Sequence, residues 1–196
     1  MVILSMMLYP LTNRPIGVVR DLTLPWETNI PFIREFVVIY HVSYPLMFVN
    51  LILFLIRYRD VFVKSTIAIA LGNVLGFFTY LLYQTEVPRP EALGNDLFSR
   101  LLRMTYSVDN PYNGFPSLHL SSTTIILIAV LSSKCHKGYK IFSIVLSTLI
   151  LLSTLFIKQH TLLDVFGGVV YGALSYLVVA YGLNLKSKNG NFRSGK

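Results

Sequence analysis

Five apolar stretches, each with no more than two charged residues, dominate this 196-residue chain. An α-helix needs about 20 such residues to cross a lipid bilayer, and the third and fourth stretches are at the short end of that range. The stretches are residues 32–56, 66–83, 117–131, 141–157 and 162–183. Only 13% of all residues are charged, whereas soluble domains carry about 25%. The sequence therefore predicts an all-α fold, a polytopic transmembrane bundle of about five spanning helices.

The first ten residues, MVILSMMLYP, form a shorter apolar segment that ends at Pro10. It is too short to span a bilayer, and it lacks the basic start and small-residue cleavage site of a signal peptide. We expect it to lie in the interface or to pack as a half-helix. The chain length fits one domain. We expect a single transmembrane domain over residues 1–185 and a basic cytoplasmic tail over residues 186–196.

Positive charge is concentrated in three short segments, residues 57–64, 134–140 and 186–196. Five crossings place all three on the same side of the membrane, and an excess of Lys and Arg marks the cytoplasmic side. We therefore expect an integral protein of the plasma membrane with its C-terminus in the cytoplasm. The net charge of +8 reflects this orientation and does not indicate a nucleic-acid partner.

Three polar groups interrupt the apolar pattern, and the predicted topology brings all three to the extracytoplasmic face. They are residues 84–90 (QTEVPRP), 113–119 (NGFPSLH) and 158–164 (KQHTLLD). Ionisable residues at the edge of a membrane helix are costly and are usually functional. Their convergence on one membrane surface predicts a functional site there.

In the third group, His160 and Asp164 are four residues apart and would share a helix face if the segment is helical. The carboxylate could then accept the Nδ1–H of the imidazole and leave Nε2 free as a nucleophile or base. For these two residues alone, a polar pair that only closes a helix end is an equally good interpretation.

The other two groups supply features that bind anions. Pro116 suits the first turn of a helix, where free N–H groups, the helix dipole and the Ser117 hydroxyl can hold a phosphate. His119 follows as a proton donor. Arg89, between two prolines, can bind phosphate oxygens bidentately. The alternatives are a serine N-cap with a hydrated histidine, and a stiff turn with a solvated arginine.

Two histidines, an orienting carboxylate, cations and a helix N-terminus suit phosphoryl transfer to a histidine nucleophile without a metal. Cys135 is the only cysteine, so a metal site of the multi-cysteine kind cannot form. We expect neither a metal nor another cofactor. His41, within the first apolar stretch, is expected to be a packed, hydrogen-bonded histidine.

The order and spacing of the three groups resemble the phosphatidic-acid phosphatase type 2 superfamily of membrane lipid phosphatases and phosphotransferases. The family pattern consists of Lys-x6-Arg-Pro, Pro-Ser-Gly-His and Ser-Arg-x5-His-x3-Asp segments. The chain matches it at Arg89-Pro90, at Pro116-Ser117 with His119, and at Ser153 with His160 and Asp164. The resemblance implies that His160 forms a phosphohistidine, that Asp164 orients it and that His119 protonates the leaving group. Arg89 and Ser117 would hold the phosphate.

Three positions depart from the family pattern: Leu82 replaces the lysine, Leu118 the glycine and Thr154 the arginine. Lys158 lies four residues after Thr154, one turn along the same face of a helix. We therefore expect Lys158 to supply a cation to the phosphate, with snorkelling to the lipid headgroups as the alternative. These relaxed motifs are similar to those of the inositol-phosphoceramide and sphingomyelin synthase branch.

The predicted function is hydrolysis of lipid phosphates or diphosphates, of the phosphatidic acid or polyprenyl diphosphate type, by a metal-independent phosphatase. One alternative is the transfer of a phosphate-bearing head group between lipids. Another is a non-catalytic lipid-binding or transport protein, although transporters place polar residues near the bilayer midplane and here they gather at one surface. The expected partners are the lipid phosphate substrate and membrane lipids.

Overall fold

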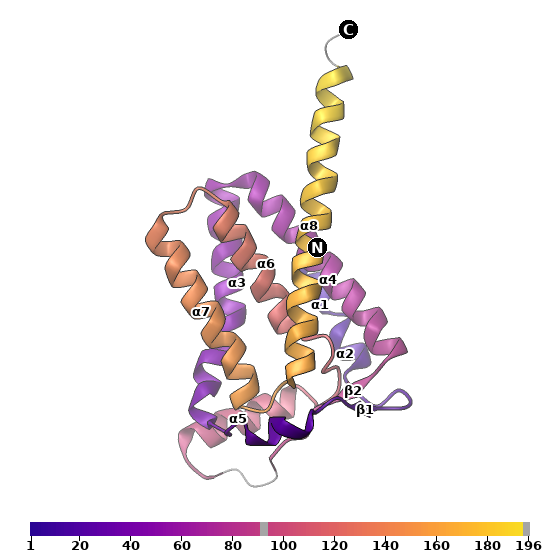
Figure 1. Cartoon of the computed structure of the whole chain (residues 1–196), viewed down its shortest axis with the longest axis vertical. Helices are drawn as coiled ribbons and strands as arrows, with labels where there is room; N and C mark the ends of the chain where they lie inside the picture. Colours follow the sequence, from indigo (N-terminus) through magenta and orange to yellow (C-terminus); the bar gives the residue numbers. More distant parts are fainter. Residues whose placement is uncertain (91–93, 194–196) are drawn as a thin grey trace.

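The computed structural model describes residues 1–90 and 94–193, with side chains as far as Leu185, and the chain folds into a bundle of helices (Figure 1). Its main helices are α3 Val37–Arg57, α4 Arg59–Leu82, α6 Leu118–Ser132, α7 Lys137–Phe156 and α8 Leu162–Arg193. They correspond one to one to the five predicted stretches. The predicted all-α transmembrane bundle is therefore confirmed.

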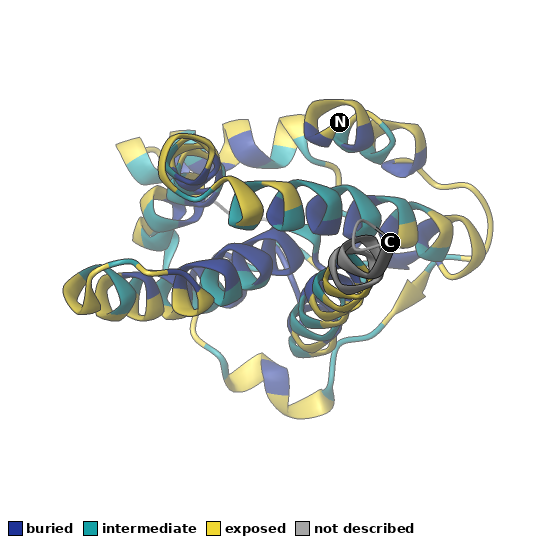
Figure 2. Cartoon of the chain, turned by 90° about the horizontal axis from the view of Figure 1, so that it is seen from above, coloured by how far each residue is buried: buried dark blue, intermediate teal, exposed yellow. Residues whose placement is uncertain are grey.

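Within the described residues, four helices are long and apolar enough to cross a membrane: α3 with the turn before it, α4, α7 and the Leu162–Leu185 part of α8. Of the predicted spans, α6 is the one that falls short, because its 15 residues are fewer than a straight span needs. It is the central helix, packed against α3, α4, α7 and α8. Figure 2 shows that it is buried over most of its length. Because protein surrounds α6, it need not match the thickness of the bilayer.

Glycines allow α8 to approach α6 closely. A Cβ atom added at Gly168 would overlap the carbonyl oxygen of Ser117, and one added at Gly172 would overlap that of Ser121. Membrane helices commonly pack through small residues, because the lipid gives little hydrophobic force to drive helix association. The start of α6 is consequently held against the first turns of α8, so the second and third polar groups lie side by side.

The N-terminal segment forms five short elements. The first packs beside α4 away from the polar groups, and the other four cover the end of the bundle where those groups lie. The five elements are α1 Val2–Met6, α2 Tyr9–Thr12, the strand β1 Arg20–Asp21, and the 3-10 helices Pro25–Asn29 and Arg34–Phe36. The strand β1 pairs in parallel with β2 Thr85–Glu86. The N-terminal apolar segment thus folds as two short helices, both packed against α4, and it does not form a sixth spanning helix.

The helix α5 Leu97–Val108 has no counterpart among the predicted elements. Charged residues interrupt its apolar positions, so it does not stand out as a long apolar run. The carboxylate of Asp96 caps it by accepting hydrogen bonds from Phe98 N (3.0 Å) and Ser99 N (3.2 Å). It packs against α3 and lies across the lower end of the bundle in Figure 1.

Basic segments lie at one end of the bundle, and the predicted polar groups lie at the other. The connections α3–α4 and α6–α7 and the C-terminal end of α8 lie at the upper end in Figure 1, and the three predicted polar groups lie at the lower end. The described parts of the three basic segments therefore share one end, which is the arrangement that the charge distribution predicts for a single orientation in the membrane.

Replacing Gly172 by alanine should destabilise the bundle, because the added methyl group would overlap the backbone of α6 at Ser121. We expect the free energy of unfolding to fall by about 1–3 kcal/mol, measured as an earlier thermal transition in detergent. The matched control is Gly182→Ala on the same helix, where the added group meets no atom within 4 Å. The control should be neutral or slightly stabilising. Equal transitions in the two variants would contradict the close approach of α6 and α8.

Candidate functional site

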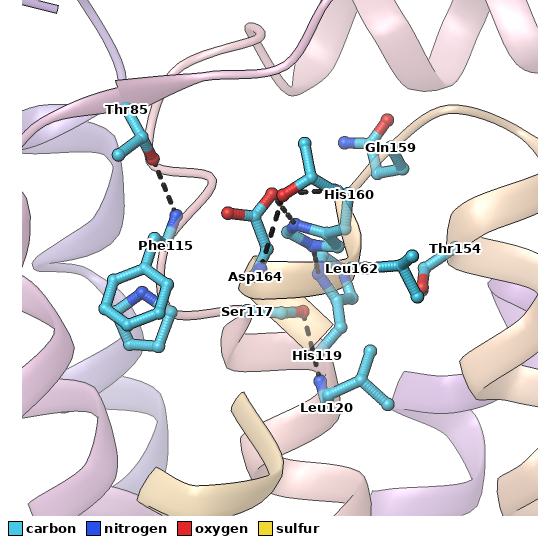
Figure 3. Close-up of polar contacts among 12 residues, drawn as sticks. Thr85, Phe115, Ser117, His119, Leu120, Thr154, Gln159, His160, Leu162 and Asp164 are labelled. Atoms are coloured by element: carbon cyan, nitrogen blue, oxygen red, sulfur yellow. Dashed lines mark hydrogen bonds and ion pairs between the residues drawn. The ribbon is translucent and has the colours of Figure 1, made fainter. Parts of the chain in front are cut away.

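Two histidines from different elements face each other at the lower end of the bundle. His119 lies in the first turn of α6, and His160 lies in the turn between α7 and α8. Both side chains are buried. The Nε2 atom of His160 is 3.5 Å from the Nδ1 atom of His119, and Figure 3 shows the two residues together. The fold thus brings together two histidines that are 41 residues apart in the sequence.

Asp164 is fixed beside His160 by the first turn of α8. Thr161 N donates a hydrogen bond to Asp164 Oδ2 (2.8 Å), and Asp164 N donates to Thr161 Oγ1 (3.3 Å), which is a reciprocal capping arrangement. His160 Nδ1 lies 3.7 Å from the same Oδ2 atom. Because α8 begins at Leu162, His160 lies outside the helix, and the condition for a shared helix face is not met. The capping turn brings them together instead.

The second ring nitrogen of His119 has a partner that the sequence did not reveal. The Tyr40 hydroxyl, on α3, lies 2.7 Å from His119 Nε2, and the ring of Tyr44 lies beside the same imidazole. Tyr40 is buried. A tyrosine hydroxyl can donate a hydrogen bond to a neutral imidazole nitrogen or accept one from a protonated imidazole. Tyr40 therefore holds the His119 ring in either state of protonation.

Ser117 is the N-cap of α6, which begins at Leu118. Pro116 therefore precedes the helix, and the expectation that it lies in the first helical turn is wrong. Its Oγ atom accepts a hydrogen bond from Leu120 N (3.3 Å), and its own N–H donates to the carbonyl oxygen of Asp164 (3.0 Å). The capping bond uses a lone pair of the hydroxyl, so its O–H remains able to donate. This backbone bond ties the start of α6 to the start of α8 beside the histidine pair.

Arg89 is oriented by neutral groups. Its guanidinium donates hydrogen bonds to the carbonyl oxygen of Tyr106 (3.2 Å) and to Gln159 Oε1 (3.3 Å), and it stacks over the Tyr106 ring at 4.2 Å. Burial lowers the pKa of the Arg89 guanidinium, while the negative charge of Asp109 opposes that shift. An arginine remains protonated in proteins, so a full positive charge is held here in a fixed position.

Gln159 connects Arg89 to a buried network that sequence reasoning missed. Its Nε2 atom donates to Asp109 Oδ2 (2.6 Å). The other oxygen of that carboxylate accepts from the Tyr9 hydroxyl (2.7 Å) and from Asn13 Nδ2 (2.9 Å). The N-terminal segment therefore supports the site. The local sequence carries no signal for this role, because the partners are about 50 to 100 residues apart.

Lys158 lies at the site, but it is not on a helix as the sequence indicated. Helix α7 ends at Phe156, and Lys158 follows with a φ of 50°, so the expected helical turn from Thr154 to Lys158 is wrong. The Lys158 ammonium donates to the carbonyl oxygen of Ile30 (2.7 Å). Partial burial lowers the pKa of Lys158, and the negative charge of Glu27 opposes that shift.

A first cavity of about 450 Å³ lies on the His160 side of the histidine pair, and His160, Arg89, Lys158 and Glu27 are among its lining residues. The Glu27 carboxylate is occupied by neutral donors, because it accepts hydrogen bonds from Leu24 N and Leu162 N (both 3.0 Å). Two cations and an imidazole make this cavity suitable for an anion such as phosphate.

Leu82 and Thr154, which replace the lysine and the arginine of the family pattern, do not face this cavity. Leu82, at the end of α4, is 82% exposed, and Thr154 is buried with its hydroxyl donating to the carbonyl oxygen of Leu151 (2.8 Å). Neither residue is part of the cavity lining. Among the described residues, no three His, Cys, Asp or Glu side chains are grouped so that they could hold a metal ion.

Comparisons with known proteins identify a family and a similar fold. The family model of the PAP2 superfamily matches residues 61–188. No match was found among curated proteins. The crystal structure of LpxE from Aquifex aeolicus is similar in fold, with a TM-score of 0.54 and 20% sequence identity, over 91% of this chain and 95% of that chain.

Removing the Asp109 carboxylate should destabilise the protein. In Asp109→Ala, the Tyr9 hydroxyl and the amides of Asn13 and Gln159 lose their acceptor, so we expect the free energy of unfolding to fall by about 1–3 kcal/mol. Thermal unfolding in detergent would measure it. Asp60→Ala, which removes an exposed ion pair with Lys64, is the control and should change little. Similar curves for both variants would show that the network carries no stability.

Proposed function

Because this chain belongs to the PAP2 superfamily, we propose that it is a membrane enzyme that hydrolyses lipid phosphates or diphosphates through a phosphohistidine intermediate. The observation that carries the proposal is the geometry around His160. This buried imidazole lies between the carboxylate of Asp164 and the ring of His119, and it lines a cavity that also holds Arg89 and Lys158.

In the first step, His160 Nε2 attacks phosphorus and forms an N–P bond, while its Nδ1–H faces Asp164 Oδ2. The carboxylate stabilises the positive charge that develops on the imidazole. The bond between phosphorus and the leaving oxygen breaks, and protonated His119 gives its proton to that oxygen, so the lipid alcohol is released.

Three groups would hold the phosphate oxygens while charge develops on them. Arg89 and Lys158 supply positive charge from the wall of the first cavity, and the Ser117 O–H donates from the N-terminus of α6, where the helix dipole also favours an anion. Such preorganised donors are usually the largest contribution to transition-state stabilisation.

In the second step, a water molecule gives a proton to His119 and attacks the phosphohistidine. The N–P bond breaks, inorganic phosphate leaves, and His160 returns to its starting state. Neither step calls for a metal ion, because two imidazoles transfer the proton and the phosphoryl group and cationic side chains balance the charge. We expect chelators to leave the activity unchanged.

The charge distribution supports an extracytoplasmic active site. The basic segments share the opposite end of the bundle from His160, and by the positive-inside rule that end lies in the cytoplasm. We therefore place the active site at the outer surface of the plasma membrane and the C-terminus in the cytoplasm.

The mechanism is tested at the nucleophile. His160→Ala should lower phosphate release from a lipid monophosphate by about 1000-fold or more, since one group of a cooperating set is lost. It should also abolish an acid-labile phosphohistidine that can be trapped in the wild type, and vanadate should inhibit the wild type. The control is His136→Ala, which removes a histidine at the start of α7, at the other end of the bundle. Full activity in His160→Ala would disprove the mechanism.

Lys158 is tested through both rate and pH. Lys158→Ala should reduce kcat/KM by about 10- to 1000-fold, as expected for the loss of one transition-state donor, and Lys158→Arg should retain part of the activity. Because burial lowers the pKa of Lys158, the ammonium loses its proton at a lower pH than an ordinary lysine. The wild-type activity should therefore decline on the alkaline side, and Lys158→Arg should move that decline to higher pH.

One pattern of results would contradict the proposed role of Lys158. If Lys158→Ala has the kinetics of the wild type while Arg100→Ala or Arg103→Ala is nearly inactive, the second cation comes from α5. The assignment of Lys158 would then be wrong, whereas the role of His160 would stand.

A further inference from the structure

A second cavity of about 400 Å³ lies on the other side of the histidine pair, between α2, α3 and α5. His119 is part of its wall, whereas His160 lines the first cavity. Tyr40 and Tyr44 line it from α3, and Met104 and Val108 line it from α5. The two histidines of the pair therefore line different cavities, and His41 is a further histidine in the wall of the second.

The charges of the two cavities differ. The first is lined by the cations Arg89 and Lys158. Among the described residues that line the second there is no lysine or arginine, and Asp109 contributes a carboxylate. A phosphate would be repelled by that carboxylate, whereas a neutral hydroxyl group would meet tyrosine hydroxyls and an imidazole with which it can form hydrogen bonds.

The rim of the second cavity is apolar and open to its surroundings. Val108 is 80% exposed and Met104 is 56% exposed, both on α5. Because α5 packs against the membrane helix α3, a hydrocarbon chain attached to a group in this cavity could pass over that rim into the lipid. Pockets of this size with mainly apolar walls and a few polar groups are typical of small-molecule sites.

Reaction geometry connects the two cavities. In a phosphoryl transfer the attacking and leaving atoms lie roughly in line on opposite sides of phosphorus. His160 Nε2 and His119 Nδ1 are 3.5 Å apart in this structure, so the two rings must separate to admit phosphorus between them. With phosphorus there and His160 attacking, the leaving oxygen is on the side of His119. That residue is also the proton donor for the leaving oxygen, and it forms the wall of the second cavity.

We propose that the second cavity binds the alcohol portion of the substrate, a long-chain lipid alcohol, while the phosphate occupies the first cavity. This inference rests on the proposed function and identifies its leaving-group site. When the P–O bond breaks, the proton of His119 moves to the alkoxide oxygen, and the lipid alcohol stays in the second cavity until it leaves over the rim formed by Met104 and Val108.

The test compares two phosphate monoesters that differ in the alcohol: a long-chain alkyl phosphate in detergent micelles, and phenyl phosphate, whose alcohol is small. A tryptophan in Val108→Trp would obstruct the rim of the second cavity. We expect the ratio of kcat/KM for the long-chain ester to kcat/KM for phenyl phosphate to fall by about 10- to 100-fold, as is typical when a hydrophobic pocket loses its fit to an alkyl group.

Two matched variants make the comparison specific. Ile56→Trp places the same side chain at another exposed position, at the C-terminal end of α3 and far from the second cavity, and it should leave the ratio unchanged. Thr28→Trp places it at the first cavity. If Thr28→Trp lowers the ratio and Val108→Trp does not, the chain lies in the first cavity and the proposal is overturned. If no phosphohistidine can be trapped in the wild-type protein, the proposed function itself is refuted.

A second measurement does not depend on variants or on turnover. The wild-type protein would be irradiated with a long-chain alcohol that carries a photoreactive diazirine at the end of its chain, and the labelled peptides would be identified by mass spectrometry. The proposal predicts labels on α5 and on the first half of α3, reduced by excess unlabelled alcohol. Labels confined to residues 23–32 and 87–90, which contribute to the first cavity, would overturn it.

Discussion

The site depends on one contact, in which the backbone at the start of α6 meets the backbone at the start of α8. Ser117 N donates to the carbonyl oxygen of Asp164, and the absence of a side chain at Gly168 leaves room for that approach. His119 is two residues from one partner of this bond, and His160 is four residues from the other. This hydrogen bond and the close approach at Gly168 thus help to set the separation of the two histidines. His119 lies on helix α6 and His160 in the short turn before α8, so no long loop carries the reacting groups.

Polar groups that are gathered at one end of a membrane bundle need hydrogen-bond partners. Buried polar groups without hydrogen bonds are costly, and here chain segments from outside the five main helices supply many of the bonds. Asp109 is held by Tyr9 and Asn13, and the Glu27 carboxylate accepts from the first N–H of α8. The N-terminal segment, too short to span the membrane, therefore stabilises the polar end of the bundle.

The sequence predicted those features that have a local signature. Apolar runs locate membrane helices, and the three polar groups located Arg89, His119 and His160 at one end of the bundle. The sequence did not reveal contacts between residues that are far apart in the chain. The hydrogen bond between Tyr40 and His119, for example, joins residues 79 positions apart. The amphipathic helix α5 has no long apolar run. The expected helical position of Lys158 was wrong because α7 ends two residues before it, and helical periodicity does not apply beyond a helix end.

The charges near the first cavity are oriented without being neutralised. Arg89 is held by a carbonyl oxygen and by the side-chain oxygen of Gln159, so the Asp109 carboxylate influences it only from beyond that amide. Lys158 is likewise held by a carbonyl oxygen. The Glu27 carboxylate is engaged by backbone N–H groups. If a carboxylate bound either cation directly, a phosphate would have to displace it. Neutral partners fix the direction of the cations and leave their charge available for an incoming anion, which preorganises the cavity for a phosphate without an internal competitor.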